Sequence, residues 1–76
     1  MSVSLYIEIN EPKLAGKIFD EIKAEIPPDA LIEAVSPKSG LSGNMGLFLT
    51  CSLNDNFPKL REKIENMEGV TYVIPE

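Results

Sequence analysis

Along this chain the apolar residues recur first at every second position, then at every third or fourth position, and then at every second position again. This cycle occurs twice. In the first cycle, polar residues alternate with an apolar set made of Val3, Leu5, Ile7 and Ile9. This alternation is typical of a strand with one buried face. From Leu14 to Ile26 the apolar residues recur at intervals of three and four, opposite a charged face. That spacing predicts an amphipathic helix.

Polar residues and prolines mark the two ends of this helix. Asn10 or Glu11 can cap its first turn, and Pro12 suits the first turn because its nitrogen has no proton to leave unpaired. Pro27 and Pro28 end it. The short apolar segment Ala30 to Val35 then predicts a second strand, and Glu33 and Pro37 are the residues that an edge strand uses to discourage unwanted pairing.

The second cycle begins after a segment rich in serine and glycine, Ser36 to Gly46, which predicts a mobile hairpin loop. A third strand starts near Met45, with one face made of Leu47, Leu49, Cys51 and Leu53 and the other of Phe48, Thr50 and Ser52. A second helix follows the caps Asn54, Asp55 and Asn56; it carries an apolar stripe and ends at Gly69. Val70 to Ile74 predicts the last strand.

The order strand, helix, strand, strand, helix, strand predicts an α+β fold of the ferredoxin-like type. Residues 1–76 would form a single domain, a βαββαβ sandwich in which a four-stranded antiparallel sheet carries both helices on one face. The opposite face of the sheet, which includes Tyr6, Phe48 and Tyr72, would lie open or meet a partner.

Size and charge bear on the partners of the chain. The hydrophobic core of a chain as short as 76 residues stabilises the folded state by only about 3 to 5 kcal/mol. We therefore expect a homodimer or a protein partner. Twelve acidic residues against seven basic ones give a net charge of −5, which makes nucleic acid an unlikely partner because phosphate binding depends on lysine and arginine. No apolar run is long enough to span a membrane. With one cysteine and no signal-peptide pattern, the chain is expected in the cytoplasm.

The residue inventory argues against catalysis. Without histidine there is no Ser-His or Cys-His pair, and with one cysteine there is no structural zinc site, so neither a cofactor nor a metal is expected. Cys51, among leucines, is expected to be an inert core thiol. The carboxylate pairs Asp20-Glu21 and Glu62-Glu65 lie on polar helix faces and are expected to be solvated. We therefore expect a protein that binds rather than an enzyme.

Two weaker binding signals are also present. Gly40, Gly43 and Gly46 fall three residues apart, and the backbone N–H groups of such a loop can bind an anion, but an ordinary hairpin connection is favoured. Lys59, Arg61 and Lys63 open the second helix at alternate positions, which do not share a helix face, so a solvated surface is favoured.

The residues around the two helices carry a resemblance to a known family. The segment from Asn10 to Phe19, Asn-Glu-Pro-Lys-Leu-Ala-Gly-Lys-Ile-Phe, resembles the entry to the first helix of ACT domains, and Leu60 to Val73 is similar to the closing helix and strand of that family and of Lrp/AsnC regulatory domains. The resemblance implies a non-catalytic regulatory module that binds an amino acid at an oligomer interface. It implies that the ligand turn is formed by Asn10, Pro12, Lys13, Leu14 and Ala15, with Lys13 standing where the family has glycine.

Two further resemblances imply a protein-interaction subunit instead. The ending Gly69 to Glu76 is similar to the last strand of subtilisin-propeptide-type inhibitors, and the run from Leu47 through Asp55 to Arg61 is similar to the small dimerising subunit of the KEOPS tRNA-modification complex. An interaction through the second strand or the open sheet face would use Tyr6, Leu31, Ile32, Glu33 and Phe48.

Overall fold

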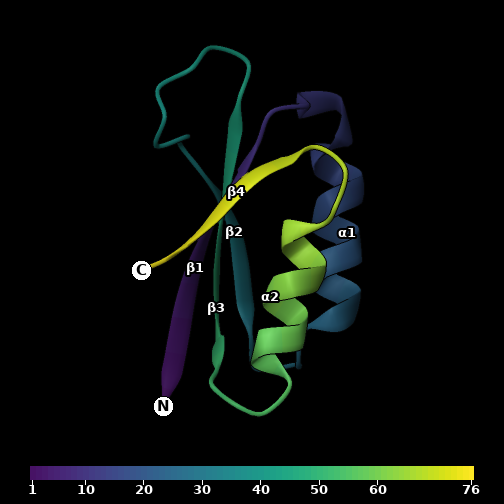
Figure 1. Cartoon of the computed structure of the whole chain (residues 1–76), viewed down its shortest axis with the longest axis vertical. Helices are drawn as coiled ribbons and strands as arrows, with labels where there is room; N and C mark the ends of the chain where they lie inside the picture. The colour runs from purple at the N-terminus through teal and green to yellow at the C-terminus, as the bar shows by residue number, and fades with distance from the viewer.

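The structure, a computed structural model, describes all residues from 1 to 76. One sheet and two α-helices make up the chain (Figure 1). In chain order the elements are β1 (Ser2–Ile9), the 3-10 turn η1 (Pro12–Leu14), α1 (Ala15–Glu25), β2 (Leu31–Val35), β3 (Met45–Ser52), α2 (Phe57–Glu65) and β4 (Val70–Pro75).

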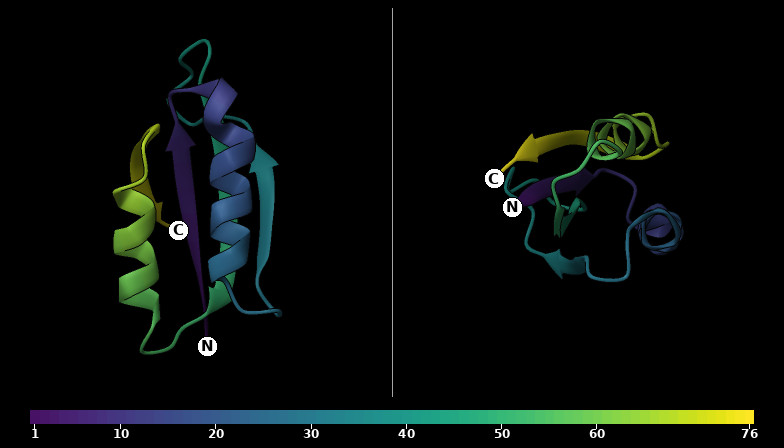
Figure 2. Two further views of the ribbon diagram at one scale, coloured as in Figure 1. Left: turned by 90° about the vertical axis from the view of Figure 1, so that its right-hand side faces the viewer. Right: turned by 90° about the horizontal axis from the view of Figure 1, so that it is seen from below.

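The sheet has the strand order β2-β3-β1-β4, with every neighbouring pair antiparallel. Both helices cover the same face of the sheet, as the two views in Figure 2 show. This is the βαββαβ arrangement of a ferredoxin-like fold, so the predicted fold class is confirmed. β2 and β4 are the edge strands.

The core lies between the helices and the sheet. It is formed by alternate residues of β1 and β3 and by the apolar stripes of the helices, and its fully or almost fully buried members are Leu5, Ile7, Ile9, Ala15, Ile18, Ile22, Leu47, Leu49, Ile64 and Val73. Cys51 is buried next to the leucines of β3, as expected, whereas Leu53 lies beyond the end of that strand and is exposed. No helix is long and apolar enough to cross a membrane.

The helix ends differ in detail from the predicted ones. Pro12 opens η1 rather than α1, and neither Asn10 nor Glu11 caps a helix with its side chain. The backbone N–H of Asn10 instead donates to the carbonyl oxygen of Gly69, 2.9 Å away, and ties the start of the first helical segment to the turn before β4. Gly69 has a φ of 92° in that turn, a conformation that favours glycine.

The sheet face opposite the helices is not open along its whole length. The loop between β2 and β3, residues 36–44, folds over one end of this face, away from the helices (Figure 1). Tyr6, which we expected to lie open or to meet a partner, is 0% exposed beneath that loop. The prediction for Tyr6 was wrong because the pattern of one strand does not reveal what a distant loop covers.

Candidate functional site

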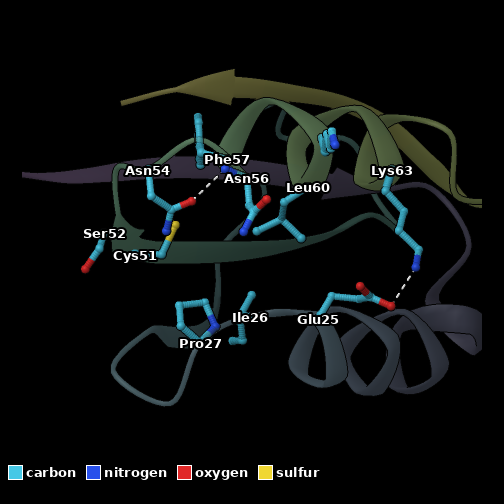
Figure 3. A pocket seen from close by; sticks show the side chains of 11 residues that line it. Glu25, Ile26, Pro27, Cys51, Ser52, Asn54, Asn56, Phe57, Leu60 and Lys63 are labelled. Carbon is cyan, nitrogen blue, oxygen red and sulfur yellow. Dashed lines mark hydrogen bonds and ion pairs between the residues drawn. The ribbon is translucent and has the colours of Figure 1, made fainter.

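The largest hollow of the molecule is a cleft between the end of α1, the end of β3 and the start of α2 (Figure 3). It has a volume of about 440 Å³, which is within the usual range of small-molecule sites. Its lining consists of Glu25, Ile26, Pro27, Cys51, Ser52, Asn54, Asn56, Phe57, Lys59, Leu60 and Lys63.

The apolar part of the cleft follows from the helical and strand periods of the sequence. Ile26 is the last apolar residue of the α1 stripe, Phe57 and Leu60 begin the α2 stripe, and all three are half-buried against the core. Cys51 comes from the core-facing side of β3. The two stripes do not meet at this end of the sandwich, so their last apolar side chains line a hollow instead of packing against each other.

Two lysines give the cleft a positive rim. Lys59 and Lys63 are four residues apart and therefore lie on the same face of α2. The ammonium of Lys63 donates to Glu25 Oε1 across the cleft, 2.6 Å away, and this pair links α2 to α1 (Figure 3). Lys59 is exposed and forms no ion pair.

Two of the remaining polar side chains in the cleft have hydrogen-bond partners. The hydroxyl of Ser52 donates to Asp29 Oδ2, 2.8 Å away, and the side-chain oxygen of Asn54 accepts the backbone N–H of Asn56 at 2.8 Å (Figure 3). These contacts leave the ammonium of Lys59 and the side-chain amide nitrogens of Asn54 and Asn56 as free donors, and the side-chain oxygen of Asn56 as a free acceptor.

Cys51 is not prepared for nucleophilic chemistry. The residue is 4% exposed, and burial, followed by the nearby charge of Asp29, raises the pKa of its thiol. The thiol is therefore protonated near neutral pH, and only a thiolate attacks an electrophile efficiently. The arrangement can bind and orient a ligand, but it offers no activated nucleophile. No group of three or more metal-ligating side chains lies together.

The ligand turn implied by the ACT resemblance lies at the opposite end of the molecule from this cleft (Figure 1). Leu14 is the one residue of that set that lines a hollow, which has a volume of about 150 Å³ and which it shares with Lys17, Ile18, Glu21 and Glu68. Ala15 is buried in the core, whereas Asn10, Pro12 and Lys13 are exposed. The structure therefore does not bring the five residues together around one cavity.

Four of the five candidate interface residues lie on β2 or on the adjacent strand β3. Leu31 is 72% exposed, Glu33 is exposed, and Ile32 and Phe48 are half-buried, so these four side chains are accessible in the single chain. Tyr6 is inaccessible and cannot contribute to an interface while the loop covers it.

A second polar site, which we did not predict, is centred on Glu8. This carboxylate is fully buried on the sheet face away from the helices. Its Oε1 accepts the hydroxyls of Tyr6 at 2.6 Å and Tyr72 at 2.7 Å and the backbone N–H of Ser39 at 3.1 Å. Its Oε2 accepts the amide nitrogen of Asn44 at 2.7 Å. We call these five residues the Glu8 clasp.

The clasp fixes the ionisation of its members. Burial alone would raise the pKa of Glu8, but the four hydrogen bonds outweigh it and hold that pKa well below its usual value. Burial, followed by the hydrogen bond to Glu8, raises the pKa of Tyr6 to about 12. The hydrogen bond to Glu8, followed by burial, also raises the pKa of Tyr72. Near neutral pH the clasp is one carboxylate surrounded by neutral donors.

The clasp changes the interpretation of the serine- and glycine-rich loop. A backbone N–H of this loop does bind an anion, but that anion is the chain's own Glu8 carboxylate. The backbone N–H of Lys38 also donates to the Tyr6 hydroxyl, 2.7 Å away, and the ammonium of Lys38 lies 5.2 Å from the Tyr6 ring centre. The loop is thus fastened to the sheet, contrary to the predicted free hairpin.

Sequence signals existed for some of these groups. Glu8 is a charged residue between the apolar residues Ile7 and Ile9 near the end of β1, and its neighbours in the sheet are Gly46 and Tyr72. The spacing of Lys59 and Lys63 already places them on one helix face, a signal that the alternate spacing of Lys59, Arg61 and Lys63 obscured. Nothing in the sequence marked the cleft itself, because three separate segments form it.

Comparison of the chain with models of known protein families and with characterised proteins finds no match.

Proposed function

We propose that this protein is a non-catalytic cytoplasmic module that binds a small molecule in the cleft between the helix ends. The observation that carries the proposal is the hollow of about 440 Å³, which has four hydrophobic residues in its lining and two lysines on its rim. Binding sites for small molecules combine an apolar pocket with a few polar groups that orient the ligand. The cleft has this composition, whereas the hollow beside Leu14 has a volume of only about 150 Å³.

Ligand binding would also connect the two helices, because the cleft is bounded by the end of α1 and the start of α2. A ligand that binds only the folded state stabilises it by RT ln(1 + [L]/Kd). The module would therefore report its ligand as a change in stability and in the packing of its two helices.

The test is a thermal-shift screen with amino acids and small carboxylic acids at millimolar concentration, followed by NMR mapping with a ligand found in the screen. The proposal expects chemical-shift changes in residues 25–27 and 51–63. Leu60→Trp, which fills the cleft, should abolish binding, whereas Leu53→Trp, at an exposed site outside the cleft, should not. A screen without any stabilising compound, or shifts confined to residues 10–15, would contradict the proposal.

A second candidate function is self-association or docking through β2. This strand pairs with β3 on one side only, so its other side has free backbone donors and acceptors. Its exposed face carries Leu31 and Val35. If two copies of β2 pair antiparallel about a two-fold axis, the residue on the axis lies directly opposite the same residue of the other copy. An axis at Glu33 would place two carboxylates opposite each other, so an axis at Ile32 is favoured.

Light scattering tests this candidate. Leu31→Lys places a charge on the strand edge, and Leu41→Lys makes the same change at a similarly exposed site in the loop. If β2 is the interface, the first variant should lower the mass in solution and the second should leave it unchanged. A wild-type protein that is monomeric at high concentration would exclude self-association and leave docking on a different protein.

A further inference from the structure

The residues that line the cleft carry a net positive charge in a negatively charged protein, and Asp29, bonded to Ser52, lies beside them. Its lining carries Lys59, Lys63 and one acidic residue, Glu25, whereas the whole chain has a net charge of −5. The start of α2 lies in the same wall and adds the positive end of a helix dipole. Charge complementarity at this site therefore favours an anion.

Building on the proposed function, we infer that the ligand is a monoanion with an apolar body, a carboxylic acid whose head group pairs with Lys59 and whose body lies over Ile26, Phe57 and Leu60. Lys59 is the lysine on the rim without an ion-pair partner, and Asn54 and Asn56 have free amide donors in the lining of the same cleft. The three apolar side chains are half-buried and offer a surface for an aromatic or branched body.

The charged groups and acceptors of the lining disfavour a zwitterion such as a free amino acid. An ammonium group needs an acceptor, and the one carboxylate in the lining, Glu25, already accepts Lys63 at 2.6 Å. The oxygen of Asn54 accepts a backbone N–H, the hydroxyl of Ser52 is bonded to Asp29, and the side-chain oxygen of Asn56 remains as a free but uncharged acceptor. An ammonium would therefore find no unpaired negative charge in the lining, whereas a carboxylate would meet the unpaired ammonium of Lys59.

Three probes of the same shape separate these possibilities: 3-phenylpropanoate, its neutral amide 3-phenylpropanamide, and phenylalanine. Binding to the full chain is measured by NMR titration at low salt. We expect the carboxylate to bind about tenfold or more tightly than either analogue, with an affinity that falls as salt is added. Equal binding of the amide or of phenylalanine would overturn the monoanion inference and leave the proposed cleft function standing.

Two lysine variants locate the charge that recognises the ligand. Lys59→Gln should weaken 3-phenylpropanoate binding about tenfold and leave binding of the amide unchanged. Lys13→Gln, the matched change in the turn at the other end of the molecule, should have no effect. A loss of binding in Lys13→Gln with none in Lys59→Gln would overturn the assignment. Both residues are exposed, so neither change should disturb folding.

The single cysteine provides an independent readout. Because Cys51 lines the cleft, bound 3-phenylpropanoate should slow its reaction with methyl methanethiosulfonate, a small neutral thiol reagent. The amide at the same concentration should slow it much less. If the carboxylate is seen to bind by NMR but leaves the thiol reaction unchanged, the ligand lies elsewhere and the cleft assignment is overturned.

Discussion

Residue 46 has to be glycine because the ring of Tyr6 occupies the space that a side chain would need. A Cβ at this position would lie 2.9 Å from Cε1 of Tyr6 and 3.1 Å from the carbonyl oxygen of Ser36. Gly16, on the surface of α1, has nothing within 4 Å of an added Cβ. Packing therefore requires glycine at residue 46, whereas residue 16 has room for a side chain.

We predict that Gly46→Ala destabilises the fold by about 1 to 3 kcal/mol, because the added methyl forces the Tyr6 ring or the backbone at Ser36 to shift. Gly16→Ala should stabilise it by about 0.5 to 1 kcal/mol, because alanine loses less conformational entropy in a helix. Urea unfolding of both variants measures the difference. A neutral Gly46→Ala would mean that the ring does not lie against residue 46.

The two tyrosines of the Glu8 clasp should also differ. The Tyr6 hydroxyl is buried, donates to Glu8 and accepts the backbone N–H of Lys38, so Tyr6→Phe should cost about 1.5 to 3 kcal/mol. The Tyr72 hydroxyl makes the bond to Glu8 alone and is half-buried, so Tyr72→Phe should cost less. Equal losses in urea unfolding would contradict this ranking.

At the scale of elements, the loop from residue 36 to 44 acts as a cover for one end of the sheet. Its backbone donors reach two side chains of β1, Tyr6 and Glu8, and the side chain of Asn44 adds a second bond from the loop to Glu8. Lys38 also forms an ion pair with Glu76, after the end of β4. The loop is therefore fastened both to β1, one of the two central strands, and to the residue that follows β4.

This arrangement predicts slow amide hydrogen exchange at Lys38 and Ser39, relative to Ser42 and Gly43, whose amides donate to no protein group. Asn44→Ala should speed exchange at Lys38 and Ser39 because it removes one bond to Glu8. Asn66→Ala, which removes a bond of similar length at the end of α2, should leave the loop amides unchanged. Uniformly fast exchange across residues 36–44 would contradict the clasp.

At the scale of the whole molecule, the clasp links stability to pH at both extremes. The pKa of Glu8 lies below its ordinary value of 4.5 in the folded state, so its contribution is fully present above pH 4.5. Below that pH the unfolded chain takes up a proton that folded Glu8 does not, and stability falls. The pKa of Tyr6 rises from 10.0 to about 12, so its contribution is present below pH 10 and is lost as the pH rises toward 12.

We therefore expect the free energy of unfolding to be highest between about pH 5 and pH 10. Glu8→Gln should lower this plateau and flatten the acid limb, because the variant has no carboxyl group to titrate at residue 8. Tyr6→Phe should flatten the alkaline limb for the same reason. Urea unfolding across the pH range measures both limbs, and an acid limb that is unchanged in Glu8→Gln would assign it to other carboxyl groups.

The sequence by itself determined the elements and their order. The two-residue period of Val3 to Ile9, the helical stripe from Leu14 to Ile26 and the repeat of both patterns depend on local geometry, and a chain of this order has few ways to bury its apolar faces. The core positions of β1 and β3 followed from the same period.

The tertiary structure alone decided the cleft and the clasp. Both are formed by side chains from three or more separate segments, such as Glu8, Ser39 and Tyr72, whose approach depends on strand register and loop path. A periodic pattern specifies which face of an element is apolar, but it does not specify which distant polar groups will meet there. For this reason Tyr6 was predicted to be open although it is buried, and the Lys59 rim was not predicted at all.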